Sequence, residues 1–400
     1  MKGAVFVLPA TTAGEQGPVA AWVSTAGWAG AARRVLGKSW IVTPSGLVEP
    51  DVARTRGSAP HLASNAAPSW RRRVPVSAKT AVKDLRQWQR ARRFHVDPEG
   101  PWSSTPLAFV WQRHELFHRA GIDLAHALGV PSVLFVPATL VWEREKWGTA
   151  RPRWADALER VGEQRALRSA DLVACGSTAV VEEVTRLGVP EERTIITPTG
   201  VDLSLFEHVG DPSALRHRLG LDGQFVVGWV GSFRRFHAIE QVIEAMVGLD
   251  GATVLLVGDG PERPRIVDLA RSRKVTAVFT GTVPHDELPL HLAAMDAALV
   301  VAAPDAPFHY SPLKLAEYLA AGLPVVAPRV GQPAVRLVDG VDAVLVDAGD
   351  VSAIGAALRD LRDDPVRRAA IGRAARATAE ATWSWDDQVR RITDAVARES

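Results

Sequence analysis

The chain contains 400 residues, of which 47% are hydrophobic and 23% are charged, and this composition excludes a disordered or fibrous protein. A formal net charge of +2 gives no electrostatic reason to expect a nucleic-acid partner, and the single cysteine, Cys175, excludes an intramolecular disulfide or a multi-cysteine zinc site. The length predicts two domains of about 200 residues each.

The first ten residues contain one lysine and a short apolar run, which predicts a first buried strand and no signal peptide. Nowhere does the sequence approach the ~18 to 20 uninterrupted apolar residues that a membrane-spanning helix needs. We therefore expect a cytoplasmic protein, and attachment to the inner face of the membrane stays open.

Short apolar runs alternate with amphipathic stretches in the first half, which is typical of β-α-β units in a parallel sheet. Apolar positions at three- and four-residue spacing predict helices at 115–128 and 155–169. Residues 45–76, rich in Pro, Ser, Ala and Arg, are interpreted as a long irregular insertion. The strands are expected at residues 3–10, 40–43, 107–111, 132–136, 172–174 and 194–197.

Residues 78–94 are predicted to form a strongly basic amphipathic helix. Residues 71–93 contain nine lysines and arginines and one acid, Asp84. The simplest interpretation is a solvated basic face on a helix packed against the core, with an anionic membrane surface or a phosphorylated acceptor as alternative partners. The apolar side of this helix carries Val82, Leu85 and Trp88.

The alternating pattern restarts after Gly200 and predicts a second Rossmann-like domain beginning near Phe206. We expect domains at 1–205 and 206–382, followed by an amphipathic helix at 383–400. Apolar strand runs lie at 224–232, 252–260, 277–283, 297–302, 324–328 and 343–349, and helices are expected at 239–249, up to about 273, at 313–321 and up to about 382.

Two segments of the second domain have the residue types of an anion site. At 228–237 a strand runs into a glycine turn that carries two arginines and a histidine, and glycine lets a backbone approach a ligand closely. At 311–317, SPLKLAE, Ser311 is a good N-cap and Pro312 suits a helix start, where free N–H groups face an anion. Together they suit a diphosphate, whereas each alone is more simply a solvated turn or a capped helix.

Glu317 lies inside this expected helix among Leu315, Tyr318 and Leu319. A buried carboxylate needs hydrogen-bond partners because an unpaired buried charge is costly. A diol such as a ribose is a natural partner, and an exposed helix position is the alternative.

Several segments, in a fixed order from about residue 170 to 340, resemble the family 4 retaining glycosyltransferases. HYSPLKLAEYLAAGLPVVAP resembles the donor-binding motif of that family, and ADLVACGSTAVVEEVTRLGVPEERTIITPTGVDLSLF, VGSFRRFHAIEQVIEA, VGDGPERPRIVDLA and VFTGTVPHDELPLHLAAMDAALVVA resemble the family as well. The resemblance implies an α/β protein of the GT-B fold, with two Rossmann-like domains whose parallel sheets face a cleft. The first domain would bind the acceptor, the second the donor, and the C-terminal helix would cross back to the first domain.

The resemblance also implies roles for single residues. Glu317 matches the glutamate that binds the donor ribose, and Arg234 and His237 are the expected phosphate ligands; these three would carry the catalysis. The donor site would further include the helix start at Ser311, Pro312 and Leu313, the turn residues Gly231 and Ser232, Val283 near the base, and His309, which occupies the place of the first glutamate of the motif.

The acceptor side of the resemblance is weaker. Gly17, in the loop 14–18 after the first strand, occupies the place of a glycine loop that approaches the substrates, and a plain turn explains it equally well. His114 follows a strand end at the ligand-binding edge of a parallel sheet, and a packing role is at least as good an explanation. The histidine that many members have after the strand 132–136 is replaced by Pro137.

The implied reaction is a retaining transfer of a hexose from a nucleotide-diphosphate sugar to an acceptor hydroxyl, in cell-surface glycan, glycoconjugate or natural-product synthesis. The acceptor would be a sugar, a lipid-linked saccharide or a small molecule. No cofactor beyond the donor is expected, and because no Asp-x-Asp motif follows an apolar strand, no metal is expected. A nucleotide-sugar epimerase and a catalytically degenerate sugar-nucleotide-binding protein are the alternatives, and the first strand lacks the Gly-x-Gly-x-x-Gly loop of a dinucleotide oxidoreductase.

Overall fold

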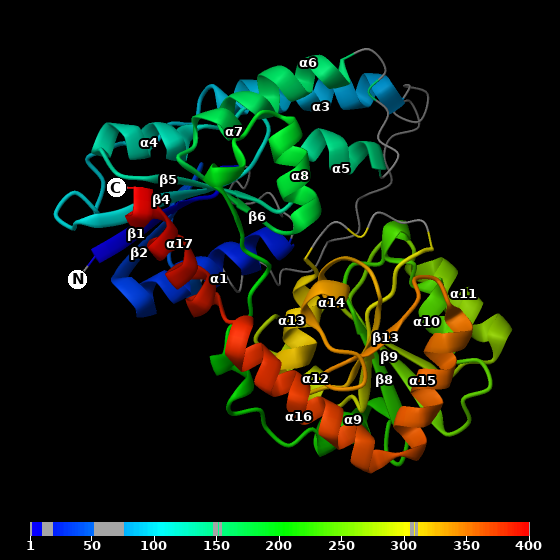
Figure 1. The fold of residues 1–400 in the computed structure, drawn as a ribbon. Coiled ribbons are helices and arrows are strands. Elements are labelled where there is room, and N and C mark those ends of the chain that lie inside the picture. The colour runs from blue at the N-terminus through cyan, green and yellow to red at the C-terminus, as the bar shows by residue number, and fades with distance from the viewer. Residues whose placement is uncertain are drawn as a thin grey trace. The chain divides into compact units, whose positions relative to one another are not determined.

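The computed structural model describes residues 2–9, 19–51, 76–146, 151, 154–304, 308 and 311–399. The chain divides into two compact units, one of Met1–Pro198 with His309–Ser311 and Trp385–Ser400, the other of Thr199–Phe308 with Pro312–Ser384 (Figure 1). The first boundary follows Pro198, whereas the second domain was expected to begin at Phe206. The second boundary follows Ser384, whereas the C-terminal helix was expected to begin at residue 383. Among the described helices, none is long and apolar enough to cross a bilayer.

The first unit contains a seven-stranded sheet in the order β3-β2-β1-β4-β5-β6-β7. All its neighbouring strands are parallel except β2 and β3, which form an antiparallel pair. An irregular insertion was expected at 45–76, but its first residues form strand β3. Residues 52–75 of that segment lie outside the described chain. The strands are β1 (Lys2–Val7), β2 (Gly37–Thr43), β3 (Gly46–Val48), β4 (Leu107–Arg113), β5 (Ser132–Val136), β6 (Leu172–Cys175) and β7 (Thr194–Ile196).

Helices lie on both faces of this sheet (Figure 1). The helix expected at 115–128 begins only at Ala120, because Phe117 has a φ of 70° and its N–H bonds to the carbonyl of Gly162, so the chain before it forms a turn. The helices are α1 (Val19–Leu36), α3 (Val76–Ala91), α4 (Ala120–Leu128), α5 (Leu140–Lys146), α6 (Ala155–Glu159), a π-helical turn (Arg160–Gln164), α7 (Arg165–Ser169), α8 (Thr178–Arg186) and α17 (Trp385–Glu399).

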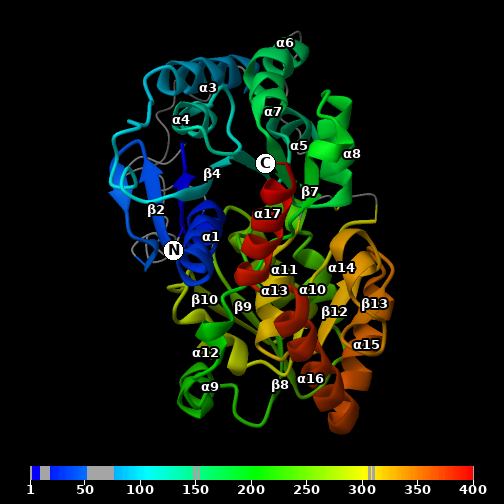
Figure 2. The ribbon, with the colours of Figure 1, turned by 60° about the vertical axis from the view of Figure 1, so that its left-hand side comes forward.

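α17 belongs to the first unit although it is the last helix of the chain. It lies beside α1 (Figure 2), as expected from the family resemblance. The indole of Trp385 is buried against Gly27, where a Cβ atom would collide with the ring, and it contacts Trp28 at 5.3 Å between ring centroids. α17 therefore completes the core of the first unit.

α3 does not pack on the core through its apolar side, contrary to the simplest expectation. Val82, Leu85 and Trp88 are exposed by 49%, 53% and 37%. Among the described side chains of this helix, the buried one is instead Asp84, which accepts hydrogen bonds from Arg151 at 2.9 and 3.1 Å and from the indole of Trp154 at 3.1 Å. A buried carboxylate must be paired, and this pairing anchors the helix while leaving its apolar side outward.

The second unit contains a six-stranded sheet in the order β10-β9-β8-β11-β12-β13, and its strands are parallel. The strands are β8 (Phe225–Val230), β9 (Ala252–Val257), β10 (Ala277–Gly281), β11 (Ala297–Leu299), β12 (Val325–Pro328) and β13 (Val344–Val346). The helices are α9 (Ser213–Leu219), α10 (Glu240–Ala245), α11 (Arg263–Arg273), α12 (Leu288–Ala293), α13 (Leu313–Ala320), α14 (Gly331–Arg336), α15 (Val351–Asp363) and α16 (Pro365–Thr382). Each unit is thus a Rossmann-like α/β layer structure, as the sequence predicts.

Candidate functional site

The candidate donor site lies in the second unit, at the carboxyl end of β8. β8 is the first strand of this sheet in chain order, but it lies in the middle of the sheet between β9 and β11. The chain runs outward from β8 first in one direction and then in the other, so the order of connections reverses there. Ligands of open α/β sheets bind at the carboxyl ends of the strands beside such a reversal. The turn after β8 and the amino end of α13 both lie at this point.

Glycines bring the turns after β8 and β9 into close contact. A Cβ on Gly258 would collide with the carbonyl oxygen of Gly231, and a Cβ on Gly260 would lie 2.7 Å from backbone atoms of Phe233. The Phe233 N–H bonds to the Asp259 carbonyl at 3.0 Å. These contacts fix the backbone of the turn that carries the predicted phosphate ligands.

α13 begins at Leu313, as the sequence predicts, but its N-cap is not the expected residue. Its N-cap is Pro312 and not Ser311, and Pro312 has no side-chain group that could cap the first N–H groups. The N–H of Leu315 bonds to the carbonyl of Pro312, whereas Leu313 and Lys314 occupy the first turn, whose N–H groups have no partner within the helix. The amino end of the helix is therefore suited to an anion.

Tyr318 joins α13 to the end of β8. Its hydroxyl oxygen accepts a hydrogen bond from the N–H of Val230 at 2.7 Å, and the ring is fully buried. Burial raises the pKa of Tyr318 far above its usual value, so the group stays neutral. This bond fixes the distance between the helix and the strand end.

Glu317 is buried, with 4% of its surface exposed, as expected from its apolar neighbours. Its Oε1 lies 2.8 Å from Nε2 of His285, which follows β10 and has 15% of its side chain exposed. Within the described chain its Oε2 has no hydrogen-bond partner, and so the carboxylate keeps acceptor capacity for a hydroxyl. The role of Glu317 toward a ribose stays a prediction; His285 was missed because nothing in the motif indicates the pairing.

Lys314 is a second residue that sequence reasoning passed over, although it stands inside the quoted motif. Its Nζ lies 3.9 Å from the centroid of the Trp229 ring, a cation–π distance. A Cβ on Gly231, which has a φ of 149°, would lie 2.9 Å from this Nζ. Burial lowers the pKa of Lys314 to about 7, and the nearby charge of Glu317 opposes that shift.

The predicted phosphate ligands differ in charge. Arg234 is exposed, and the described residues give it no ion-pair partner. His237 is half-buried, and its Nε2 lies 3.3 Å from Oγ of Ser232. Desolvation, with the charges of Lys314 and Arg234, lowers the pKa of His237 to about 2. The imidazole is therefore neutral and can serve a phosphate only as an N–H donor.

The remaining predicted donor residues are placed only in part. Val283 follows β10 and is half-buried, like Leu313 at the start of α13. Their contact with a nucleotide stays a prediction. His309 and Gly17 lie outside the described residues.

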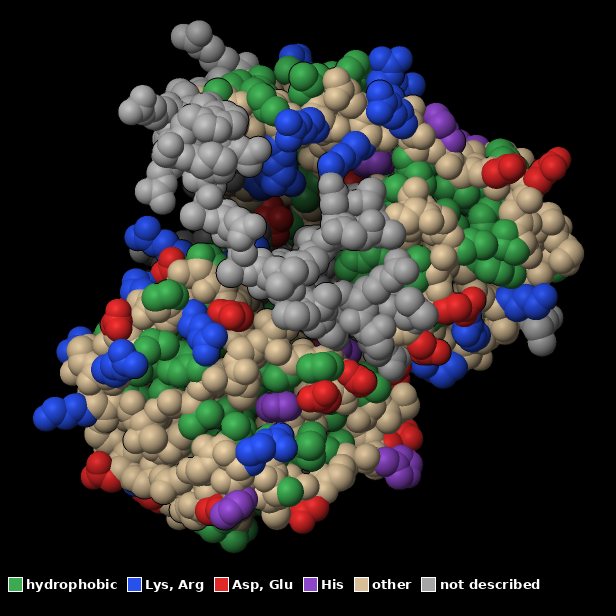
Figure 3. Space-filling model, turned by 180° about the vertical axis from the view of Figure 1, so that it is seen from behind, with side chains coloured by type: hydrophobic (Ala, Val, Ile, Leu, Met, Phe, Trp, Pro, Cys, Tyr) green, Lys and Arg blue, Asp and Glu red, His purple; other side chains and the backbone are tan. Residues whose placement is uncertain are grey.

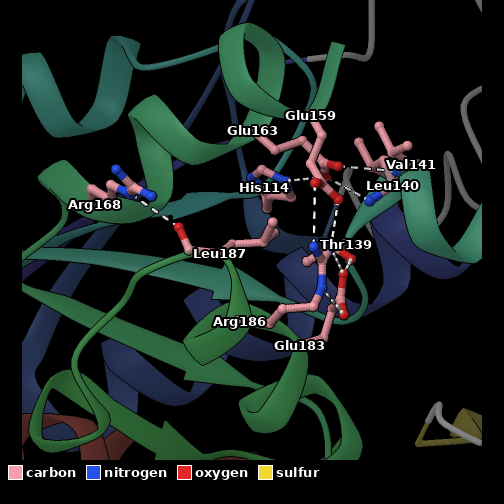
Figure 4. A network of polar contacts seen from close by, with 10 residues as sticks. All are labelled: His114, Thr139, Leu140, Val141, Glu159, Glu163, Arg168, Glu183, Arg186 and Leu187. Carbon is pink, nitrogen blue, oxygen red and sulfur yellow. Dashed lines mark hydrogen bonds and ion pairs between the residues drawn. The ribbon is translucent and has the colours of Figure 1, made fainter. Parts of the chain in front are cut away.

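His114, the acceptor candidate, is fully enclosed in the first unit. Its Nε2 lies 2.9 Å from Oε1 of Glu163 in the π-helical turn, and both side chains have 0% exposure (Figure 4). Glu163 also accepts the N–H groups of Leu140 at 2.6 Å and Val141 at 3.0 Å, and these bonds together with His114 keep its pKa low against the effect of burial. Such burial argues for packing and against contact with an acceptor.

Two half-buried neighbours of His114, Arg113 and Glu115, lie at the carboxyl end of β4. Burial raises the pKa of Glu115 and lowers that of Arg113. β4 adjoins β1 at the reversal point of the first sheet, so these groups are better placed for a ligand than His114. Among the described residues, no cluster of three or more His, Cys, Asp or Glu side chains is arranged for a metal ion.

Two family models match the chain. The model described as Glycosyltransferase Family 4 matches residues 38–205, and the model described as Glycosyl transferases group 1 matches residues 224–364. The chain belongs to glycosyltransferase family 4.

Sequence relatives agree with this membership. A GDP-mannose-dependent alpha-mannosyltransferase of Mycobacterium tuberculosis (strain CDC 1551 / Oshkosh) is 33% identical over 53% of this chain and 53% of the relative. The 2-deoxystreptamine N-acetyl-D-glucosaminyltransferase of Streptomyces fradiae is 31% identical over 72% of this chain and 66% of the relative. The chain thus spans between about half and two thirds of the length of these relatives.

The crystal structure of HepE from Anabaena in complex with UDP matches over 100% of both chains, with a TM-score of 0.66 and 18% identity. At this identity the likeness concerns the fold. The two parallel-sheet units of this chain have the GT-B fold.

Proposed function

We propose that this protein transfers a sugar, with retention of the anomeric configuration, from a nucleotide-diphosphate sugar to an acceptor hydroxyl. The observation that carries the proposal is the buried carboxylate of Glu317 in α13, the helix that Tyr318 joins to the end of β8. Family membership supports it, as do the GDP-mannose named for one relative and the UDP bound to HepE.

The proposed chemistry needs little from the protein beyond charge and position. The bond between the anomeric carbon and the diphosphate oxygen breaks, and its electron pair stays on that oxygen. The acceptor oxygen forms the new bond on the same face, and its proton passes to the leaving phosphate. The helix N–H groups and Arg234 would stabilise the growing negative charge of the diphosphate, and no metal is included in the proposal.

A thermal-shift screen tests the proposal on the full chain with GDP-mannose, UDP-glucose and UDP-N-acetylglucosamine. A ligand at one hundred times its dissociation constant adds about 2.7 kcal/mol of stability. We expect stabilisation by one nucleotide class, loss of that stabilisation in Glu317→Ala, and no change in Glu207→Ala, an exposed glutamate of the same unit.

The outcomes separate the alternatives. No shift with any of these donors would overturn the proposed function. Binding without transfer or hydrolysis of the donor would indicate a degenerate binding protein, and interconversion of the sugar without an acceptor would indicate an epimerase.

We also propose that α3 brings the first unit to an anionic membrane surface, where a lipid-linked acceptor would be found. The exposed Leu85 and Trp88 line an apolar hollow with Phe117, Leu158 and Val161. The same segment carries exposed bases, namely Lys79, Arg86, Arg90, Arg92 and Arg93. Figure 3 shows Lys and Arg side chains gathered with apolar ones at the top of the view. Apolar insertion together with basic charge is the pattern of interfacial helices.

Sedimentation with phosphatidylglycerol vesicles tests this second proposal. We expect binding that weakens with salt and is lost in Trp88→Asp, whereas Val366→Asp, at an apolar site of α16 that is more exposed than Trp88, leaves it unchanged. Equal binding by both variants would contradict a role for α3.

A further inference from the structure

Lys314 lies in the first turn of α13, where a cation can meet an anionic ligand. A lysine with a structural role would have an ion-pair partner, and Lys314 has none among the described residues. A lysine and a glutamate three residues apart on a helix commonly pair. Here Glu317 instead bonds to His285, and no ion pair joins Lys314 to any described residue. The ammonium group lies over Trp229 in surroundings that lower its pKa to about 7.

The groups around Lys314 leave a surplus of positive charge. The turn after β8 contributes the charged Arg234 and the neutral His237, and the turn after β9 contributes Asp259, which bonds to Arg263 at 3.4 Å. From its own helix Lys314 faces Glu317, the one carboxylate that counteracts its desolvation. Such a surplus of positive charge is destabilising unless an anion binds.

Gly231 makes room for this arrangement. With a φ of 149° it adopts a backbone conformation that favours glycine, and a side chain there would press on the ammonium group of Lys314. Tyr318 holds the same helix to the N–H of Val230, the residue before Gly231. Helix, strand end and turn thus fix the ammonium group beside the helix N-terminus.

We propose that Lys314 is the principal cation for the donor diphosphate and takes up a proton when the donor binds. The proposal rests on the proposed function. In this chain the cation would come from α13, while the turn after β8 offers the neutral Ser232 and His237 together with the exposed Arg234. The bound diphosphate would keep Lys314 protonated well above the pKa of the free site.

Calorimetry of the full chain with GDP-mannose, UDP-glucose and UDP-N-acetylglucosamine tests the proposal, because a diphosphate esterified at both ends holds no proton of its own near neutral pH. In wild type we expect proton uptake at about pH 8, seen as a heat that depends on the buffer, and weaker binding as the pH rises above about 7. We expect Lys314→Met to weaken binding about 10- to 100-fold and to abolish both effects.

Two further variants separate charge from structure. Lys314→Arg should restore binding without proton uptake, since arginine stays charged. Lys274→Met removes an exposed lysine of the same unit and should bind like wild type. Equal binding and equal proton uptake in Lys314→Met and Lys274→Met would overturn the role of Lys314 and leave the proposed function intact. Absence of wild-type binding would instead overturn the proposed function itself.

Discussion

Each unit of the molecule contains a histidine–glutamate pair with nearly the same distance between nitrogen and oxygen. His114 and Glu163 of the first unit lie 2.9 Å apart, and His285 and Glu317 of the second lie 2.8 Å apart. Glu163 also accepts hydrogen bonds from two backbone N–H groups, and its side chain has no exposed surface. Glu317 has His285 as its partner in the described chain, and the side chain of His285 is 15% exposed.

The difference indicates that burial of a histidine–glutamate pair does not by itself identify a functional site. A carboxylate whose acceptor sites are filled by the protein can hold the fold together and has nothing left for a ligand. A carboxylate with one oxygen that accepts no hydrogen bond from the protein, near a helix N-terminus and cations, can exchange its partner for a substrate hydroxyl. The number of free acceptor sites separates the two pairs better than the histidine–glutamate distance.

Removing Glu163 should produce the largest effect. Glu163→Ala leaves His114 and the N–H groups of Leu140 and Val141 buried without partners, and we expect a loss of about 3 to 5 kcal/mol in the free energy of unfolding. Denaturant unfolding of the full chain, followed by circular dichroism, measures it. A loss below about 1 kcal/mol would contradict the structural role of the pair.

Acid should weaken the first unit through His118, a buried neighbour of His114 whose pKa is lowered to about 4 by desolvation. The unfolded chain takes up this proton near pH 6.5 and the folded chain only near 4. The contribution of neutral His118 to stability is therefore fully present above about pH 6.5. Between about pH 6.5 and 4 the free energy of unfolding falls by about 1.4 kcal/mol per pH unit. Unfolding midpoints measured from pH 7 to about 4 should decline less steeply in His118→Asn; an unchanged slope would refute the assignment.

Removing Glu317 should have the smallest effect on stability. The loss of one hydrogen bond to a partly exposed histidine should cost about 1 kcal/mol in the free energy of unfolding, because water can replace it. The same denaturant measurement on Glu317→Ala checks this value. A cost as large as that of Glu163→Ala would mean that the two pairs have the same role and would break the comparison.

The sequence alone predicts the sheets well and the site in part. Buried parallel strands such as β5 read as short apolar runs, so their positions can be found without a structure. The burial of Glu317 follows from its apolar neighbours in α13. Its pairing with His285, 32 residues away in the chain, depends on which strand ends meet, and no local pattern contains that information.

The same limit explains the errors in the first unit. The anchor of α3 is an ion pair between Asp84 and Arg151, 67 residues apart, and the amphipathic pattern of the helix pointed to its apolar side instead. The expected helix at 115–128 was shortened by the left-handed Phe117, a conformation that a non-glycine residue adopts only under tertiary constraint. Long-range pairing overrode local propensity in both cases.

The place of α17 affects how the protein is made. Because Trp385 fills the space beside Gly27 and the buried Trp28, the ribosome must deliver the chain as far as α17 before the core of the first unit can close. The second unit ends at Ser384 and is fully synthesised earlier. The residues of the second unit are thus all synthesised before those of the first unit are. A nascent chain that stops before α17 would lack part of the core of the first unit.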